Sequence, residues 1–173
     1  METAWRAGAP EAGRALMIVD VQRGFVTDAT RHLPAAIEAI QNRFDRVVAT
    51  RFYHRPGALV CELLGIEGFA RGSPETELAF APPPGAHVLE KSTYSCVTAD
   101  FVAMLRDWNV REVGICGIDT DQCVLLIAAE LLQHDIRPIV YEDLVASAAG
   151  AEYHRAGLFV LRRLIGNEQV MRL

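Results

Sequence analysis

The stretch EVGICGIDTDQCVLLIAAELLQHDIRPIVYE, residues 112–142, contains the pattern that decides the fold. An apolar segment rich in Val and Ile (112–118) is followed by a helical pattern of apolar residues (121–135) and then by a second β-type segment (137–142). A strand, a helix and a strand in this order are typical of a βαβ unit, in which the two strands run parallel.

The same alternation continues on both sides of this unit. The other predicted strands are 15–20, 46–53, 87–91 and 168–173, and the other predicted helices are 33–44, 98–109 and 150–165. Six strands alternating with helices predict a three-layer α/β/α fold, Rossmann-like, with a six-stranded parallel sheet. A length of 173 residues predicts a single domain over 1–173. Residues 54–86 have no such period and are rich in Gly and Pro, so we expect them to form a surface excursion or a lid within that domain.

The composition argues against several classes of partner. The net charge is -5 without a basic cluster, so no nucleic acid is expected to bind. No apolar run reaches the roughly 18 residues of a membrane span. The first residues, METAWRAGAPEAG, lack the apolar core of a secretory signal, so we expect a cytoplasmic protein. Four cysteines in such a protein are expected to be free thiols; they are Cys61, Cys96, Cys116 and Cys123.

Three chemically reactive residues are expected to meet at one edge of the sheet. In an open α/β sheet, reacting groups gather at the carboxyl ends of the strands. Asp20 ends the first predicted strand, Lys91 ends the third, and Cys123 follows the fourth at the start of a helix. Lys91 is the only lysine in the chain, since every other basic residue among the 17 is arginine.

The position of Cys123 suggests an activated thiol. With Thr120 as the expected N-cap, Cys123 would lie in the first helical turn, where free amides and the helix dipole lower the pKa of a thiol. The same amides could bind an oxyanion. The alternative is a structural cysteine packed beneath the helix start.

Asp20 and Lys91 have chemistry that complements a thiol. A carboxylate can take the thiol proton and return it to a leaving group. It would also raise the pKa of the thiol, so a counter-charge is needed. The compact ammonium of a lysine suits a position between a carboxylate and a sulfur better than the wide guanidinium of an arginine. The alternatives are that Asp20 only terminates a strand and that Lys91 is a chance remnant in a lysine-poor chain.

Three segments of the chain resemble, in their order and spacing, the isochorismatase-like cysteine hydrolases. They are ALMIVDVQRGF, VLEKSTYS and VGICGIDTDQCVLLIAAELLQHDIRPIVYEDLVAS. This family includes nicotinamidases and N-carbamoylsarcosine amidase. The resemblance implies the isochorismatase-like hydrolase fold, with Cys123 as nucleophile, Asp20 as general acid/base and Lys91 as the ammonium that stabilises thiolate and carboxylate. It also implies a cis peptide bond between Ile118 and Asp119, an oxyanion hole made of the backbone amides of Asp119 and Cys123, and a homo-oligomer, either a dimer or a tetramer.

Two positions depart from the family's pattern. Asp119 stands where many relatives have a small apolar residue, and its carboxylate could oppose thiolate formation, bind a cationic substrate group or point away. Nicotinamidases bind a metal through an Asp-x-His motif, but in TRFYHRPG the aspartate is replaced by Phe52 while His54 matches the histidine. We therefore expect no metal and no other cofactor, and a metal-free branch of the family rather than a nicotinamidase.

The predicted function is hydrolysis of a small-molecule amide or a related C–N bond by a cysteine-dependent enzyme that forms a thioester acyl-enzyme. Gln22, Phe25 and Tyr94 are candidates for the substrate pocket; the alternatives are a hydrogen-bonded turn residue for Gln22 and core packing for the two aromatic residues. One rival is an isochorismatase-type enol-ether hydrolase that needs no thiol, which the presence of Cys123 disfavours. The other is a non-catalytic binding or scaffold protein on the same fold, which the intact set of acid, lysine and thiol disfavours.

Overall fold

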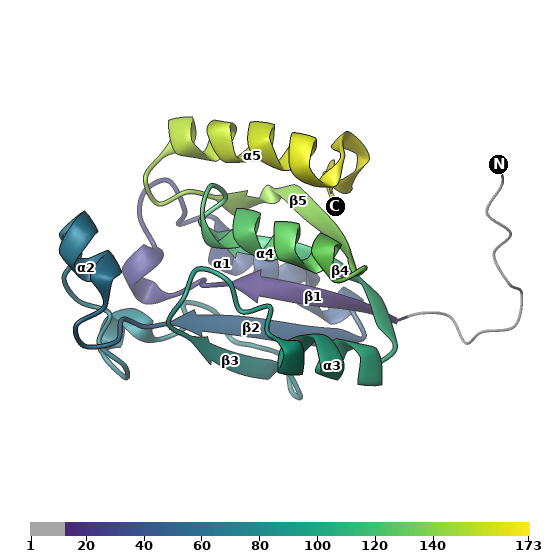
Figure 1. The fold of residues 1–173 in the computed structure, drawn as a ribbon, viewed down its shortest axis with the longest axis horizontal. Helices are drawn as coiled ribbons and strands as arrows, with labels where there is room; N and C mark the ends of the chain where they lie inside the picture. The colour runs from purple at the N-terminus through teal and green to yellow at the C-terminus, as the bar shows by residue number, and fades with distance from the viewer. Residues whose placement is uncertain (1–12) are drawn as a thin grey trace, which may run out of the picture.

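The computed structural model describes residues 13–173 (Figure 1). Most of the N-terminal stretch for which we predicted no secretory signal lies outside the described residues. The centre is a six-stranded sheet in the order β3-β2-β1-β4-β5-β6, with every neighbouring pair parallel. The strands are β1 (Gly13–Val19), β2 (Arg46–Phe52), β3 (His87–Lys91), β4 (Val110–Ile118), β5 (Arg137–Ala146) and β6 (Val170–Met171).

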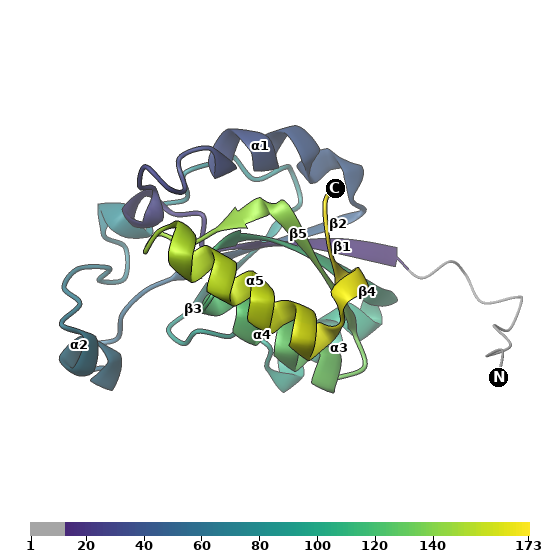
Figure 2. The same ribbon diagram turned by 90° about the horizontal axis from the view of Figure 1, so that it is seen from above.

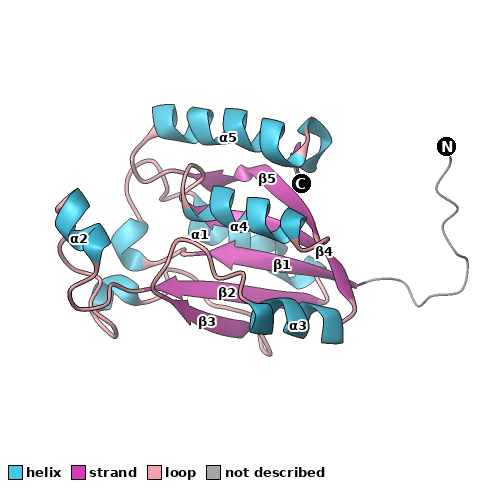
Figure 3. Cartoon of the chain, in the orientation of Figure 1, coloured by secondary structure: helices cyan, strands magenta, loops and turns pink. Residues whose placement is uncertain are grey.

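Helices cover both faces of this sheet, which confirms the predicted three-layer α/β/α fold (Figures 2 and 3). The helix α1 lies on one face, and α3, α4 and α5 lie on the other. The α-helices are α1 (Leu33–Ile40), α2 (Leu59–Leu64), α3 (Ala99–Asp107), α4 (Cys123–Gln133) and α5 (Ala151–Ile165), and the short 3-10 helices are Arg23–Phe25, Gln41–Arg43, Pro74–Thr76 and Asn167–Gln169. No helix within residues 13–173 is long and apolar enough to cross a membrane.

The strand β1 illustrates why the sheet needs two covering layers. Successive side chains of a strand point to opposite faces. Met17 belongs to the core beneath α3, α4 and α5, whereas Leu16 and Ile18 belong to the core beneath α1. All three side chains are fully buried, so the strand is apolar without alternation, as is usual for a central strand of a parallel sheet.

The strands β1 and β4 approach each other closely at their carboxyl ends. Gly117 has a φ of +116°, and a Cβ at this position would lie 2.1 Å from the carbonyl oxygen of Val19. Only glycine fits such an approach. As a result, the residues that follow the two strands, Asp20 and Asp119, leave the sheet side by side.

The segment 54–86, expected to be a surface excursion or a lid, is not free of regular structure. The segment contains the helix α2 and the 3-10 helix Pro74–Thr76. The helix is only 6 residues long, has no side-chain cap and leaves Leu59, Leu63 and Leu64 more than half exposed. A helix that buries so little apolar surface needs no stripe of apolar residues along one face, and the sequence of α2 shows none.

Candidate active site

The structure brings Asp20, Lys91 and Cys123 together, and we call these three residues the charged cluster. Asp20 directly follows β1, Lys91 is the last residue of β3, and Cys123 is the first residue of α4, which follows β4. The Nζ atom of Lys91 lies 2.6 Å from Oδ2 of Asp20 and 3.3 Å from Sγ of Cys123. All three residues are less than 10% exposed, so water screens these interactions little.

The ammonium of Lys91 is tightly held. Nζ also donates to the carbonyl oxygens of Thr93 (3.0 Å) and Tyr94 (3.1 Å) and lies 4.9 Å from the ring centre of Phe52. Burial by itself lowers the pKa of Lys91, but its interactions with the carboxylate of Asp20 and with the sulfur of Cys123 outweigh burial, and the net result is a raised pKa. Lys91 is therefore a permanent positive charge at the end of β3. A wider arginine head would collide with one of these neighbours.

Thr50 of β2 fixes the carboxylate of Asp20. The hydroxyl of Thr50 donates to Oδ1 of Asp20 (2.7 Å) and accepts the amide of Asp20 (3.0 Å). Asp20 has a φ of +50°, unusual for a residue other than glycine, and this double contact holds its backbone there. Thr50 was not among the site residues predicted from the sequence. Its signal was a single hydroxyl within the apolar strand VVATRF, a buried polar group that must find a partner.

The surroundings of Cys123 differ from the prediction in two ways. The helix α4 starts at Cys123 itself, and Thr120 does not cap it, because its hydroxyl pairs with Nδ1 of His154 at 2.9 Å. The prediction of a lowered thiol pKa is wrong for the free protein: burial raises the pKa of Cys123 well above its usual value, and Asp20 adds to this while Lys91 opposes it. The thiol therefore keeps its proton until a base removes it.

The backbone before Cys123 presents free amides. The peptide bond between Ile118 and Asp119 is cis. The carbonyl oxygen of Asp119 accepts the amides of Gln122 (3.2 Å) and Val124 (3.1 Å). Within residues 13–173, no backbone hydrogen bond outside the regular strands and helices uses the amides of Asp119 or Cys123 as donors. Both amides are thus available to a ligand oxygen.

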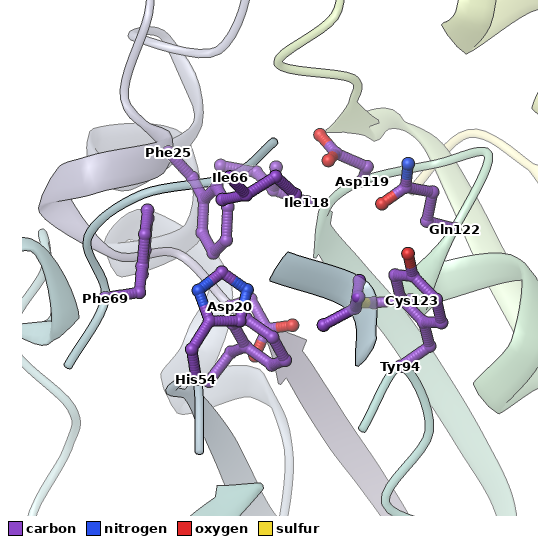
Figure 4. A pocket seen from close by; sticks show the side chains of 12 residues that line it. Asp20, Phe25, His54, Ile66, Phe69, Tyr94, Ile118, Asp119, Gln122 and Cys123 are labelled. Carbon is purple, nitrogen blue, oxygen red and sulfur yellow. The ribbon is translucent and has the colours of Figure 1, made fainter. Parts of the chain in front are cut away.

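A pocket opens above the charged cluster and contains about 460 Å³ of empty space, including open solvent at its mouth. Its lining is mostly apolar and aromatic, with few polar groups (Figure 4). The lining residues are Asp20, Phe25, Phe52, His54, Val60, Ile66, Phe69, Tyr94, Ile118, Asp119, Gln122 and Cys123.

Residues from the segment 54–86 complete this pocket. Val60, Ile66 and Phe69 contribute apolar side chains, and we call them the apolar roof. Phe69 stacks on Phe25 with ring centres 4.3 Å apart. Phe25 and Tyr94, both predicted pocket candidates, line the cavity, whereas the roof was not predicted because no periodic pattern marks its positions in the sequence.

Gln22 does not belong to the lining. Its side-chain nitrogen donates to the carbonyl oxygens of Phe52 (2.9 Å) and Thr76 (3.0 Å), and its oxygen accepts the amide of Phe52 (2.7 Å). The side chain is fully buried and has all its bonds within the protein. Gln22 therefore ties the end of β2 to the segment 54–86, which is the alternative role considered for it.

The carboxylate of Asp119 is anchored to the backbone that follows β5. Oδ1 of Asp119 accepts the amide of Ala148 at 2.5 Å. Burial raises the pKa of Asp119 to about 6; the Ala148 amide opposes this, and the nearby carboxylates of Asp121 and Asp20 add to it. Close to neutral pH the group is mostly ionised, so it brings a second negative charge to the site besides Asp20.

The surroundings of His54 do not fit a metal ion. Its Nδ1 lies 3.2 Å from the carbonyl oxygen of Gly68, and its ring meets the ring of Phe52 edge-on, with centres 4.9 Å apart. In the described part of the chain, no three His, Cys, Asp or Glu side chains are grouped so that they could hold a metal.

Comparison with known proteins agrees with this geometry. The family model of the isochorismatase domain matches residues 14–170. An isochorismatase-like hydrolase from Alkaliphilus metalliredigens superimposes with a TM-score of 0.79 at 19% identity, covering 88% of this chain and 92% of that one. A nicotinamidase from Bacillus subtilis gives 0.75 at 21% identity, with coverages of 89% and 97%.

The N-carbamoylsarcosine amidase from Thermoplasma acidophilum is more similar in sequence, at 28% identity, with a TM-score of 0.70 and coverages of 86% and 92%. No curated protein sequence matches the chain. The family model extends over nearly all of the chain, and the fold agrees with it from β1 to β6. The chain therefore belongs to the isochorismatase family and is a hydrolase.

Proposed function

We propose that the chain hydrolyses a small-molecule amide or a related C–N bond through a thioester on Cys123. The observation that carries this proposal is the contact of one buried ammonium, Lys91, with both a carboxylate and a thiol beneath a small pocket. Two of the structurally similar proteins are an amidase and a nicotinamidase, which supports C–N bond hydrolysis. The enol-ether alternative would leave the thiol in this cluster without a role.

In the first half-reaction, Asp20 takes the proton of the Cys123 thiol while the sulfur attacks the carbonyl carbon. The oxyanion that forms accepts hydrogen bonds from the amides of Asp119 and Cys123. The C–N bond then breaks, Asp20 returns the proton to the leaving nitrogen, and the acyl group stays on sulfur. In the second half-reaction, Asp20 takes a proton from water, hydroxide attacks the thioester, and the carboxylic acid and the thiol are released.

The charges explain how a thiol with a raised pKa can act as nucleophile. Before proton transfer the negative charge is on Asp20, and after it the charge is on the sulfur. Lys91 contacts both atoms, so it stabilises the charge in either position. The proton moves within a cluster whose total charge is unchanged, which avoids the cost of creating a new buried charge.

The segment 54–86 is proposed to act as the substrate-facing lid, because it supplies the apolar roof.

Oligomerisation, to a dimer or a tetramer, is likewise proposed, and exposed apolar residues of α5 are consistent with it; they include Phe159, at 77% exposure, and Tyr153, at 55%. Gel filtration with light scattering measures this directly. A strictly monomeric protein at micromolar concentration would contradict it.

The proposal is tested with a panel of small amides and ureido compounds, for which Cys123→Ala serves as the blank. The matched control is Cys116→Ala, which also deletes one buried thiol but in the core beneath α1. We expect ammonia or amine release by the wild type and by Cys116→Ala, and none by Cys123→Ala. Equal turnover by Cys123→Ala would refute the proposed nucleophile.

A further inference from the structure

The pocket contains a carboxylate, that of Asp119, in addition to the carboxylate of the charged cluster. Lys91 already pairs with Asp20 at 2.6 Å. None of the ion pairs found within residues 13–173 includes Asp119. The carboxylate of Asp119 therefore lines the pocket without a basic side chain of the protein to compensate it.

This carboxylate is fixed in position. The Ala148 amide donates to Oδ1 of Asp119 at 2.5 Å, and no hydrogen bond found within residues 13–173 uses Oδ2, so Oδ2 remains available to a ligand. Figure 4 shows Asp119 and Gln122 on the side of Cys123, with Phe25 and Phe69 on the opposite side. The pocket thus has a polar, negatively charged side next to the thiol and an aromatic side facing it.

A neutral substrate would meet an obstacle in this site. Formation of a thiolate and then of an oxyanion on the amides of Asp119 and Cys123 adds negative charge to a pocket that Asp119 also lines, and like charges within one largely buried pocket repel each other. A positive charge on the substrate would offset this repulsion and pair with Asp119. The carboxylate then favours the correct substrate and disfavours neutral ones.

We infer that Asp119 is a specificity-determining residue that binds a cationic nitrogen of the substrate, so that the substrate is a small amide with an ammonium or amidinium group close to the scissile bond. The inference rests on the proposed function of the site. The ionised form of Asp119 is required, and the groups that influence it are the carboxylates of Asp121 and Asp20 and the amide of Ala148.

The decisive variant is Asp119→Asn. An asparagine keeps an oxygen that can accept the Ala148 amide, so the loop retains its anchor while the charge is lost. The matched control is Asp121→Asn, which removes a neighbouring carboxylate that does not line the pocket.

The substrates are pairs in which a methyl group replaces an ammonium. Glycinamide with propionamide, and 2-phenylglycinamide with 2-phenylpropanamide, place the cation on the acyl side. N-(2-aminoethyl)acetamide with N-propylacetamide places it on the leaving-group side. At neutral pH, we expect the wild type to prefer the cationic member of at least one pair in kcat/KM by about 10- to 100-fold, the effect of one hydrogen bond to a charged group.

In Asp119→Asn this preference should disappear, with slower cleavage of the cationic member and no slowing of the neutral member, while Asp121→Asn should keep the preference. An equal loss on both members of a pair would overturn the inference, because Asp119 would then act on the oxyanion loop and not on the cation. A wild-type preference for the neutral members would overturn it as well. If Cys123→Ala still cleaved the amides, the proposed function would fail instead.

A binding measurement makes the test independent of turnover. Isothermal calorimetry compares benzylamine, which is cationic at neutral pH, with benzyl alcohol, which is neutral. We expect Asp119→Asn to weaken benzylamine binding by about tenfold or more and to leave benzyl alcohol unchanged. Unchanged benzylamine affinity in Asp119→Asn, or stronger binding of benzyl alcohol than of benzylamine to the wild type, would contradict the inference.

Discussion

The charged cluster and the apolar roof line the same small pocket but are built in different ways. The cluster lies at the carboxyl ends of β1 and β3 and at the start of α4, is almost fully buried and has a partner for nearly every polar atom. The roof comes from a segment with one short helix and several glycines of positive φ, and Ile66 of the roof is 37% exposed. The cluster is suited to chemistry, which needs fixed geometry, and the roof to substrate selection, which tolerates variation.

This contrast predicts that changes in the cluster abolish the reaction, whereas changes in the roof alter only substrate binding. The largest effect is expected for Lys91. Lys91→Met leaves Asp20 buried and unpaired, which should lower the free energy of unfolding by about 3–5 kcal/mol and reduce turnover at least ~10³-fold. Lys91→Arg keeps the charge but not the size, and it should also lose most activity. Near-normal turnover of Lys91→Arg would contradict the steric role given to Lys91.

The second prediction separates reactivity of the thiol from catalysis. Asp20→Asn removes the base, so kcat should fall by about 10²- to 10⁴-fold. The same change removes a charge that raises the pKa of Cys123 and leaves Lys91 free to stabilise the thiolate, so alkylation by iodoacetamide near pH 7 should become faster. Peptide mass spectrometry locates the modified thiol. Slower alkylation of Cys123 in Asp20→Asn would contradict the opposing effects of Asp20 and Lys91 on the thiol.

The third prediction concerns the roof. Phe69→Ala removes a ring that stacks on Phe25, so KM should rise by about tenfold while kcat changes by less than about threefold. Gly24→Ala is a second test, since a Cβ there would lie 2.3 Å from the ring of Phe69 and displace it. Steady-state kinetics on a substrate from the amide panel checks both. A selective loss of kcat would show that the roof takes part in the chemistry.

The smallest effect is a pH-dependent gain of stability in Asp119→Asn. Because the folded pKa of Asp119 is raised to about 6, the unfolded chain ionises first, and wild-type stability falls as pH rises from about 4 to 6. Below about pH 4 the carboxyl is protonated in both states and this penalty vanishes. We expect Asp119→Asn to exceed the wild type in the free energy of unfolding by up to about 3 kcal/mol at neutral pH and to show no gain near pH 4. Urea titrations at both pH values measure this; a gain of equal size at both would contradict it.

The cluster and the fold could be predicted from the sequence because both follow from simple regularities. Apolar runs spaced by helical patterns specify a parallel sheet, and its topology brings the carboxyl ends of β1, β3 and β4 to one edge. The three residues of the charged cluster lie at or just after those ends. Their proximity could therefore be predicted without knowledge of side-chain packing. The N-cap of α3 is also local in origin, since the hydroxyl of Thr98 accepts the amide of Phe101, three residues further along the chain.

The roof and the electrostatics could not be predicted for physical reasons. The segment that carries Phe69 has no periodic pattern of apolar residues. The position of the Phe69 ring depends on its packing against Phe25, which is distant in sequence. The helix α4 begins later than predicted because the hydroxyl of Thr120 pairs with His154, a residue distant in sequence, and does not cap the helix. The pKa of Cys123 is raised by burial, which depends on the whole fold, and this outweighs the local effect of a helix start.

The central claim is that Cys123 carries the acyl group during turnover. Rapid acid quenching of the enzyme with a cleaved amide, followed by peptide mass spectrometry, tests it most directly. We predict that the peptide containing Cys123 gains the mass of the acyl group, that hydroxylamine removes this mass, and that Asp20→Asn fails to form it. Sustained turnover by Cys123→Ala, with no adduct on the wild-type peptide, would contradict the claim.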